Sequence, residues 1–229
     1  MVLGMFARLN NKLKTFLKSV KKYFFFRFSG NEVETFRKIY RTNYWGDNES
    51  VSGPGSNKVS TNELVSFLVD FVEKEKIKKI HDCPCGDFNW MSEILTQIDS
   101  EYLGSDIVED IVLKNTERYS SERITFKVKN IITDELGSSD LLITRDCLIH
   151  LSNDNVRKVV DNIKRSNVKY WATTRHIEYP KLINADISNG DFRALDIEEA
   201  PFDFNCQKVA EFNELDQGSH KRVLSVYRM

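Results

Sequence analysis

The sequence predicts an α/β protein of the Rossmann-like, doubly wound type. We expect a mostly parallel sheet of about seven strands, an antiparallel C-terminal hairpin and an N-terminal helical extension. From residue 77 onward, short apolar runs alternate with segments of helical periodicity, as in βαβ proteins. The first run, residues 79–82, breaks into a Pro/Gly turn just before a helix, which is typical of a nucleotide-like site. The 229 residues are enough for one such domain with an appendage.

Residues 1–29 form the extension and differ from the rest of the chain in composition. All their charges are Lys or Arg, and apolar side chains such as Phe6, Leu13 and Phe24 recur at helical spacing. Lysines interrupt the segment too often for a transmembrane helix, and no signal-peptide cleavage site follows it. Two interpretations remain: a helix lying on an anionic membrane surface, or a helix packed on the domain or on a neighbouring subunit.

Residues 30–229 form the main domain, which begins with helices and a loop over residues 30–76. Residues 31–44 carry an apolar helical face, and a Gly/Ser/Pro-rich loop over residues 44–57 follows, with Trp45 at its entrance. A linker would explain this loop, but small residues behind a Trp favour an ordered lid over a ligand. Ser60 with Glu63 reads as a capping box at the start of the next helix.

Residues 77–229 form the predicted Rossmann-like core. Its expected strands are residues 79–82, 102–108, 124–131, 140–144, 168–174, 208–212 and 223–227. Helices are expected from residue 92, over 110–119 and around 156–163, and an irregular stretch over 177–201 is expected to be a substrate loop. The last two strands are separated by a short gap and should pair antiparallel.

Polar residues at the strand ends indicate an adenosine ligand. Asp106, about 20 residues beyond the turn, occupies the position where such folds place a carboxylate for both ribose hydroxyls. Asn130 could bond an adenine edge while Ile131 packs on the ring. Pro84 replaces a glycine in the turn and removes an N–H, which argues against a pyrophosphate ligand and hence against a nicotinamide oxidoreductase.

Charge and cysteine content exclude other classes of protein. The net charge of −1 indicates no nucleic-acid partner. The spacing of the four cysteines does not match a zinc site, so we expect reduced, mostly buried thiols in a cytosolic protein.

Several motifs together resemble the class I S-adenosylmethionine (SAM)-dependent methyltransferases. More narrowly, the chain is similar over residues 40–229 to a glycan-associated group thought to methylate sugar hydroxyls. The motifs are residues 44–46, 52–56, 82–91, 145–150, 190–193 and 201–202, and Pro84 and Asn130 depart from the usual pattern.

The resemblance implies roles for individual residues. Asp82, Pro84 and Gly86 would hold the methionine part of SAM, Asp106 the ribose, and Ile107, Asn130 and Ile131 the adenine. Trp45, Ser52, Gly53 and Ser56 would close over the cofactor. Asp87 and Arg145, in the same motifs, complete the predicted cofactor-binding set.

Transfer of a methyl group to a hydroxyl needs an oriented oxygen and a base. His150 is the first candidate base; if a helical turn starts at Arg145, Asp146 would lie on the same face and orient it. His176 is the second candidate, and Trp90, His176 and Arg193 are candidate substrate contacts. Each His could be structural and Arg193 could be solvated. No spacing of residues requires a metal ion, although Asp146 and nearby carboxylates could bind one.

The leading interpretation is a sugar O-methyltransferase acting on a surface polysaccharide or glycolipid precursor. It would be cytoplasmic, and residues 1–29 would place it at the inner membrane face or on a glycosyltransferase. The alternatives are a small-molecule O- or N-methyltransferase and a non-catalytic binding module with the same fold.

Overall fold

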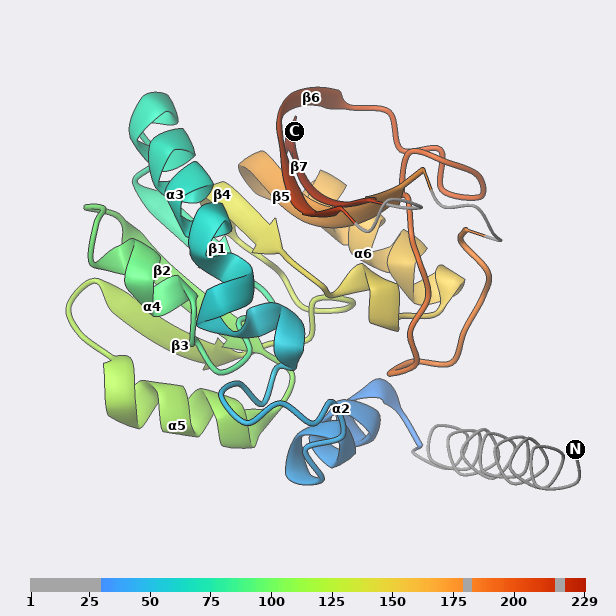
Figure 1. Ribbon diagram of the computed structural model, residues 1–229, viewed down its shortest axis with the longest axis horizontal. Coiled ribbons are helices and arrows are strands. Elements are labelled where there is room, and N and C mark those ends of the chain that lie inside the picture. The colour runs from blue at the N-terminus through green and yellow to red at the C-terminus, as the bar shows by residue number, and fades with distance from the viewer. Residues whose placement is uncertain (1–29, 179–182, 217–220) are drawn as a thin grey trace, which may run out of the picture.

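The computed structural model describes residues 30–178, 183–216 and 221–229 of the chain (Figure 1). The predicted amphipathic extension over residues 1–29 lies outside these residues and stays a prediction. Among the described residues, no helix combines the length and the apolar character needed to cross a membrane.

A seven-stranded sheet forms the centre of the domain, in the order β3-β2-β1-β4-β5-β7-β6. Neighbours among the first five strands pair in parallel, while β7 pairs antiparallel with both β5 and β6. The predicted fold class is therefore confirmed. The strands are β1 (Lys79–Asp82), β2 (Glu101–Asp106), β3 (Ile124–Val128), β4 (Ser138–Thr144), β5 (Asn167–Ile177), β6 (Gln207–Asp216) and β7 (Lys221–Arg228).

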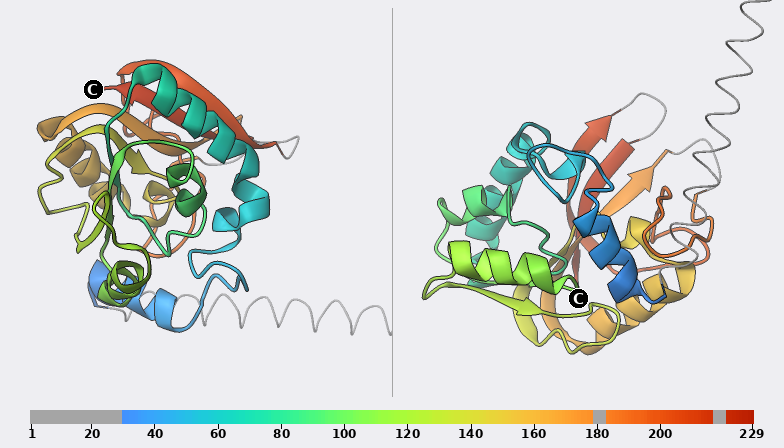
Figure 2. Two further views of the ribbon diagram at one scale, coloured as in Figure 1. Left: turned by 90° about the vertical axis from the view of Figure 1, so that its left-hand side faces the viewer. Right: turned by 90° about the horizontal axis from the view of Figure 1, so that it is seen from below.

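Helices pack on both faces of the sheet, as the views in Figure 2 show. They are α2 (Glu32–Arg41), α3 (Lys58–Glu75), α4 (Met91–Leu95), α5 (Glu109–Tyr119) and α6 (Asn153–Arg165), with short 3₁₀ turns η1 (Pro54–Ser56) and η2 (Leu148–His150). Successive strand residues point to opposite faces. Leu141 and Ile143 thus join the core under α3 and α4, whereas Leu142 joins the core under α6.

Several element boundaries differ from the sequence prediction, among them the start of α3 and the end of β5. Helix α3 begins at Lys58, because the Asn57 side chain accepts a hydrogen bond from the Ser60 backbone N–H at 2.9 Å and so caps the helix. The predicted cap at Ser60 is therefore wrong. Strand β5 runs to Ile177 because it pairs with β7 along its whole C-terminal half, which places His176 inside the strand.

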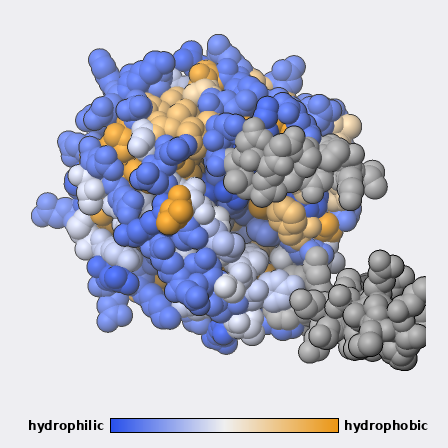
Figure 3. Space-filling view, viewed as in Figure 1, coloured by the Kyte–Doolittle hydropathy of each residue, from blue (hydrophilic) through white to orange (hydrophobic). Residues whose placement is uncertain are grey.

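The carboxyl ends of the parallel strands meet at one edge of the sheet, and α2 with the loop over residues 42–57 lies outside this edge (Figure 1). Ligands of open α/β folds bind at this position. On the face shown in Figure 3, hydrophilic residues predominate and apolar ones form separate patches.

A buried arginine attaches the irregular segment before β6 to the sheet. On β5, the Arg175 guanidinium donates to both carboxylate oxygens of Asp196, at 2.7 and 2.8 Å, and both side chains are buried. It also pairs with Glu198 and Glu211. Removing one partner of such a pair leaves an uncompensated buried charge.

We expect Arg175→Met to lower the free energy of unfolding by about 3–5 kcal/mol, because Asp196 loses its counter-charge. Urea denaturation measures the change. Arg123→Met is the matched control, since the Arg123–Asp99 pair is exposed and worth less than about 1 kcal/mol. Equal losses in the two variants would contradict a special role for Arg175.

Candidate functional site

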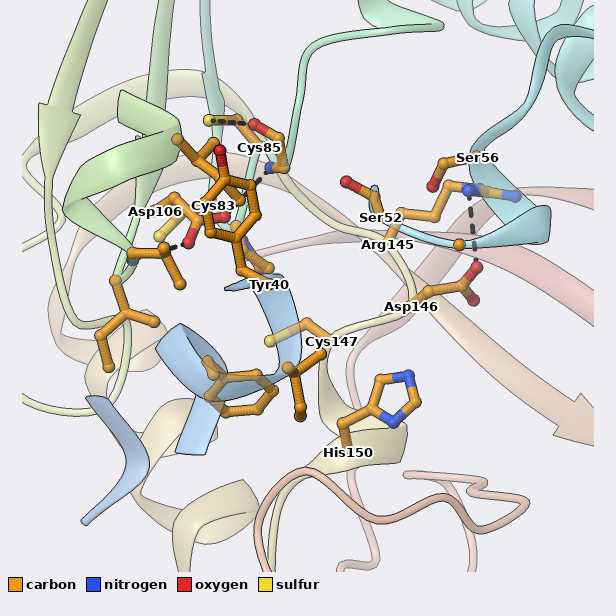
Figure 4. A pocket seen from close by; sticks show the side chains of 18 of the residues that line it. Tyr40, Ser52, Ser56, Cys83, Cys85, Asp106, Arg145, Asp146, Cys147 and His150 are labelled. Atoms are coloured by element: carbon orange, nitrogen blue, oxygen red, sulfur yellow. Dashed lines mark hydrogen bonds and ion pairs between the residues drawn. The ribbon is translucent and has the colours of Figure 1, made fainter. Parts of the chain in front are cut away.

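A cavity of ≈ 290 Å³ lies at the carboxyl ends of β1, β2 and β4 and is covered by α2 and the following loop (Figure 4). Every predicted cofactor residue lines it, from Trp45 through Arg145, and so do Trp90, Asp146 and His150. His176 and Arg193 are not among its lining residues. The parallel topology explains this convergence, because it brings the ends of strands distant in sequence to one place.

The turn after β1 requires a glycine. Gly86 has a φ of +53°, in the left-handed region, and a Cβ there would lie 2.2 Å from the Ser52 hydroxyl oxygen. The Gly86 N–H donates to Asp106 Oδ2 at 3.1 Å, so the turn is tied to the end of β2. Ser52 approaches so closely because Gly86 has no side chain.

Two buried carboxyl groups form the acidic end of the cavity. Asp82 accepts a hydrogen bond from the Tyr102 hydroxyl at 2.9 Å, and burial raises the pKa of Asp82 to about 7. Asp106 accepts from the backbone N–H groups of Gly86 and Val108, while burial raises its pKa to about 6. Because each carboxylate is costly to ionise there, a cation or a hydroxyl donor suits this end better than a phosphate.

One carboxylate holds residues 50–52 of the loop after α2. Asp87 Oδ1 accepts from the hydroxyls of Ser50 and Ser52, and its Oδ2 accepts from the Val51 N–H at 2.9 Å. In return, the Asp87 N–H donates to the Ser52 hydroxyl. The loop is therefore an ordered cover of the cavity, and Asp87 is one of its anchors; closure of this loop over a ligand stays a prediction.

Helix α2 supplies part of the cavity wall that the sequence analysis missed. Phe36, Ile39 and Tyr40 line the cavity, although their periodicity indicated only a core-facing surface. The Asn130 amide donates to Glu32 at 3.0 Å, and its carbonyl oxygen accepts from the Ile132 N–H at 3.0 Å. Both the nitrogen and the oxygen of the Asn130 side chain thus have partners within the protein, and its bond to an adenine edge stays a prediction.

A buried charge cluster forms the opposite wall, from Arg145, Asp146, Glu214 and Arg222. Arg145 donates to Glu214 at 2.7 Å and to the Gly55 carbonyl oxygen at 2.8 Å. Arg145 therefore ties η1 to the sheet and has little free capacity to hold a cofactor. Glu214, whose side chain is 1% exposed, was missed because β6 continues beyond its predicted end. Arg222 was missed because β7 begins before its predicted start.

His150 lies in η2, between two aromatic rings. Its Nδ1 lies 2.8 Å from the Asp191 carbonyl oxygen, which can only accept, so Nδ1 carries the proton. The ring centroids of Trp45 and His150 are 5.1 Å apart. Burial lowers the pKa of His150 below its usual value, although the Asp191 carbonyl acts in the opposite direction.

Asp146 does not bond His150 as the sequence predicted. The helical turn begins at Leu148, and Asp146 has a φ of +50°, which directs its carboxylate toward Arg145 and Arg222 at 3.5 and 3.4 Å. Burial opposes ionisation, but the two guanidinium groups outweigh it and lower the pKa of Asp146 to about 2. Asp146 Oδ1 has no hydrogen-bond partner among the described residues.

The other predicted substrate contacts are Arg193, His176 and Trp90, and each is packed mainly against the protein itself. Arg193 is buried and donates to the Leu148 carbonyl oxygen and to the Asn153 side chain, so its guanidinium supports η2 and is not available to a sugar. His176 is buried in β5 and does not line the cavity; its ring lies 5.9 Å from the Phe192 ring, measured between centroids. Trp90 is a core residue with one edge on the cavity.

The four cysteines are free thiols, and Cys83, Cys85 and Cys147 are buried. Burial raises the pKa of each of these three, so they stay protonated at neutral pH. In the described part of the chain, no group of His, Cys, Asp and Glu is arranged to hold a metal ion.

No protein-family model and no curated protein matches the chain. Solved structures do share its fold. The 1,6-didemethyltoxoflavin-N1-methyltransferase of Burkholderia thailandensis is 13% identical, with a TM-score of 0.62 and 86% of each chain covered. The magnesium protoporphyrin IX methyltransferase of Synechocystis PCC 6803 is 16% identical, with a TM-score of 0.55 over 93% of this chain and 96% of that one.

A third similar structure is an N-methyltransferase of Bradyrhizobium japonicum WM9 in complex with S-adenosylhomocysteine (SAH). It is 12% identical, with a TM-score of 0.59 over 83% of this chain and 97% of that one. At these identities the likeness shows the fold alone, which is that of the methyltransferases.

We expect Asp87→Ala to release the lid, because the loop loses bonds to both oxygens of one carboxylate. Amide hydrogen exchange at Val51 should become about 5- to 100-fold faster, as expected for losing roughly 1–3 kcal/mol of hydrogen bonding. Asp99→Ala, which removes an exposed carboxylate, should leave this amide unchanged. Unaltered exchange in the Asp87 variant would show that other contacts hold the loop.

Proposed function

We propose that the chain is a SAM-dependent O-methyltransferase. The observation that carries this proposal is the pair of buried carboxyl groups, Asp82 and Asp106, in the ligand position of a methyltransferase fold. Their environment favours a ligand that brings positive charge and hydroxyl donors. SAM has both, in its ammonium and sulfonium groups and in its ribose.

The same pair argues against a dinucleotide. A pyrophosphate would place negative charge beside carboxyl groups that already resist ionisation, and Pro84 removes one backbone donor from the turn. Arg145 does not compensate, since Glu214 and Asp146 already neutralise it. The cavity thus fits SAM better than a nicotinamide cofactor.

His150 has the properties of a general base in this proposal. Its Nδ1 proton is held by the Asp191 carbonyl, so the lone pair on Nε2 is available to take a proton from an acceptor hydroxyl. Burial keeps the ring neutral near pH 7. When bound, SAM would supply the electrophilic methyl group. Trp45, whose ring packs beside that of His150, would help to exclude water from the reacting oxygen.

A sugar hydroxyl is the acceptor we propose, on a surface polysaccharide or glycolipid precursor. The motifs at residues 145–150 and 190–193 support it, and the structure brings these two segments together: the Gly190 N–H donates to the His150 carbonyl oxygen at 2.7 Å. The second candidate is a small-molecule O- or N-methyltransferase, as the names of the similar structures suggest. A binding module without activity would retain the cavity but not need His150.

We expect SAM and SAH to bind with micromolar affinity and NAD not to bind. Affinity for SAM should rise from pH 5.5 to 7, because Asp82 and Asp106, with pKa values of about 7 and 6, lose protons when a cation binds. Calorimetry in phosphate and in Tris, whose ionisation heats differ, measures the proton release. Asp106→Asn should reduce the number of protons released when SAM binds. SAM binding without pH dependence would contradict the acidic site, and absence of SAM binding would contradict the function.

We expect His150→Gln to lower methyl transfer by about 10²-fold or more while SAH affinity stays unchanged. Transfer of label from SAM to a panel of simple glycosides provides the assay. In the unmodified protein, the rate should rise with pH and should reach its plateau before pH 6.5. The neutral ring is the base, and burial lowers the pKa of His150 below its usual value. His176→Gln tests the rival base and should keep the rate within about threefold. The reverse order of effects would make His176 the base.

A further inference from the structure

The rim of the cavity next to His150 carries an exposed aromatic ring. Among the described residues, the exposed large apolar side chains are Tyr44, Val59, Leu113, Val128 and Phe192. Only Phe192 of these lines the cavity, and its side chain is 52% exposed. An apolar ring left exposed at the mouth of a cavity indicates a contact surface for a ligand.

The chain holds this ring in place from both sides. Before it, the Gly190 N–H donates to the His150 carbonyl oxygen and the Asp191 carbonyl accepts from His150 Nδ1. After it, the Arg193 N–H donates to the Ile149 carbonyl oxygen at 3.2 Å. The Phe192 ring lies 6.1 Å from the His150 ring and 5.9 Å from the His176 ring, measured between centroids. The ring is therefore a fixed platform at the proposed base.

The charged groups around His150 balance one another. Asp191 and Arg193, which flank Phe192 and both act on His150, carry opposite charges, and the charge cluster at the cavity wall is balanced as well. Arg145 and Arg222 contribute two positive charges, and Asp146 and Glu214 contribute two negative charges, all joined in one cluster. An additional anion would meet carboxylates that already occupy both guanidinium groups, and an additional cation would meet the guanidinium groups themselves. A neutral ligand avoids both penalties.

One acceptor atom in this cluster is left for such a ligand. Asp146 lines the cavity, and in the described part of the chain its Oδ1 is buried without a hydrogen-bond partner, whereas Oδ2 is held by Arg145 and Arg222. A buried carboxylate oxygen is costly to leave unpaired, and a hydroxyl can donate to it. Figure 4 shows that Asp146 and His150 lie on the same side of the cavity, away from Asp106.

Resting on the proposed function, we propose that the acceptor is an uncharged sugar ring that packs one apolar face on Phe192. One of its hydroxyls donates to Asp146 Oδ1 while the reacting hydroxyl faces His150. Phe192 thereby becomes a specificity-determining residue, and the charge balance of the cluster selects neutral sugars against uronic acids and sugar phosphates.

Saturation-transfer-difference NMR on the full chain tests this selection, with and without SAH. The probes are matched pairs that share a ring: methyl galactoside with methyl galacturonate anion, and methyl glucoside with glucose 6-phosphate. We expect saturable binding of the neutral members, with transfer to their ring C–H protons, and at least about tenfold weaker binding of the anionic members. Anionic sugars bound as tightly as neutral ones, or no neutral glycoside bound at all, would overturn the proposal.

Two variants isolate the platform. Phe192→Leu keeps apolar bulk but removes the ring and should weaken neutral sugars about 3- to 10-fold, whereas Phe192→Tyr should bind them as the unmodified protein does. Leu113→Ala, on the surface of α5, is the control for loss of an exposed apolar side chain. Calorimetric SAH affinity should be equal in all of them. If the unmodified protein does not bind SAH, the proposed methyltransferase function is refuted. If SAH binds normally and Phe192→Leu does not weaken sugar binding, only the proposed role of Phe192 is refuted.

Discussion

The burial of carboxyl groups at the ends of two adjacent parallel strands is the constraint on which the site depends. Asp82 ends β1 and Asp106 ends β2, and the parallel register brings both to the same edge of the sheet. Asp106 is stabilised there by backbone N–H groups, including that of Gly86, so the turn after β1 has its shape because of the strand beside it. A side chain at Gly86 would displace Ser52 and, with it, the lid.

Polar contacts rather than a large apolar interface hold the cover of the cavity. Asp87 anchors the loop at one point, Arg145 holds the Gly55 carbonyl at a second, and the Asn130–Glu32 bond fixes the start of α2 at a third. Bonds of this kind exchange with water at modest cost, so we expect the cover to open locally at a lower free energy than the core, as entry and release of a ligand require. The core beneath it, by contrast, is closed on both faces of the sheet.

The two ends of the cavity differ in electrostatics, and this difference orders the proposed reaction. The end at Asp82 and Asp106 is acidic and suits a cationic cofactor, while the end at Asp146 and Arg222 is charge-balanced and suits a neutral acceptor. His150 lies at the second end. Its ring proton is on Nδ1, which donates to the Asp191 carbonyl oxygen. Proton removal and acceptor selection therefore involve the same few residues, joined by the segment that carries Phe192.

The sequence by itself determined the fold class, the strands along the chain and the set of cofactor residues that line the cavity, because these depend on local periodicity and on which residues end each parallel strand. It did not determine the part of the cavity wall that α2 supplies, nor which side chains contact one another. Arg145 pairs with Glu214, 69 positions away, and Arg193 supports η2 instead of facing a ligand. The expected Asp146–His150 contact fails because a left-handed residue precedes the turn. Pairing across such separations is settled by packing and by the need to neutralise buried charge, and only the tertiary structure decides both.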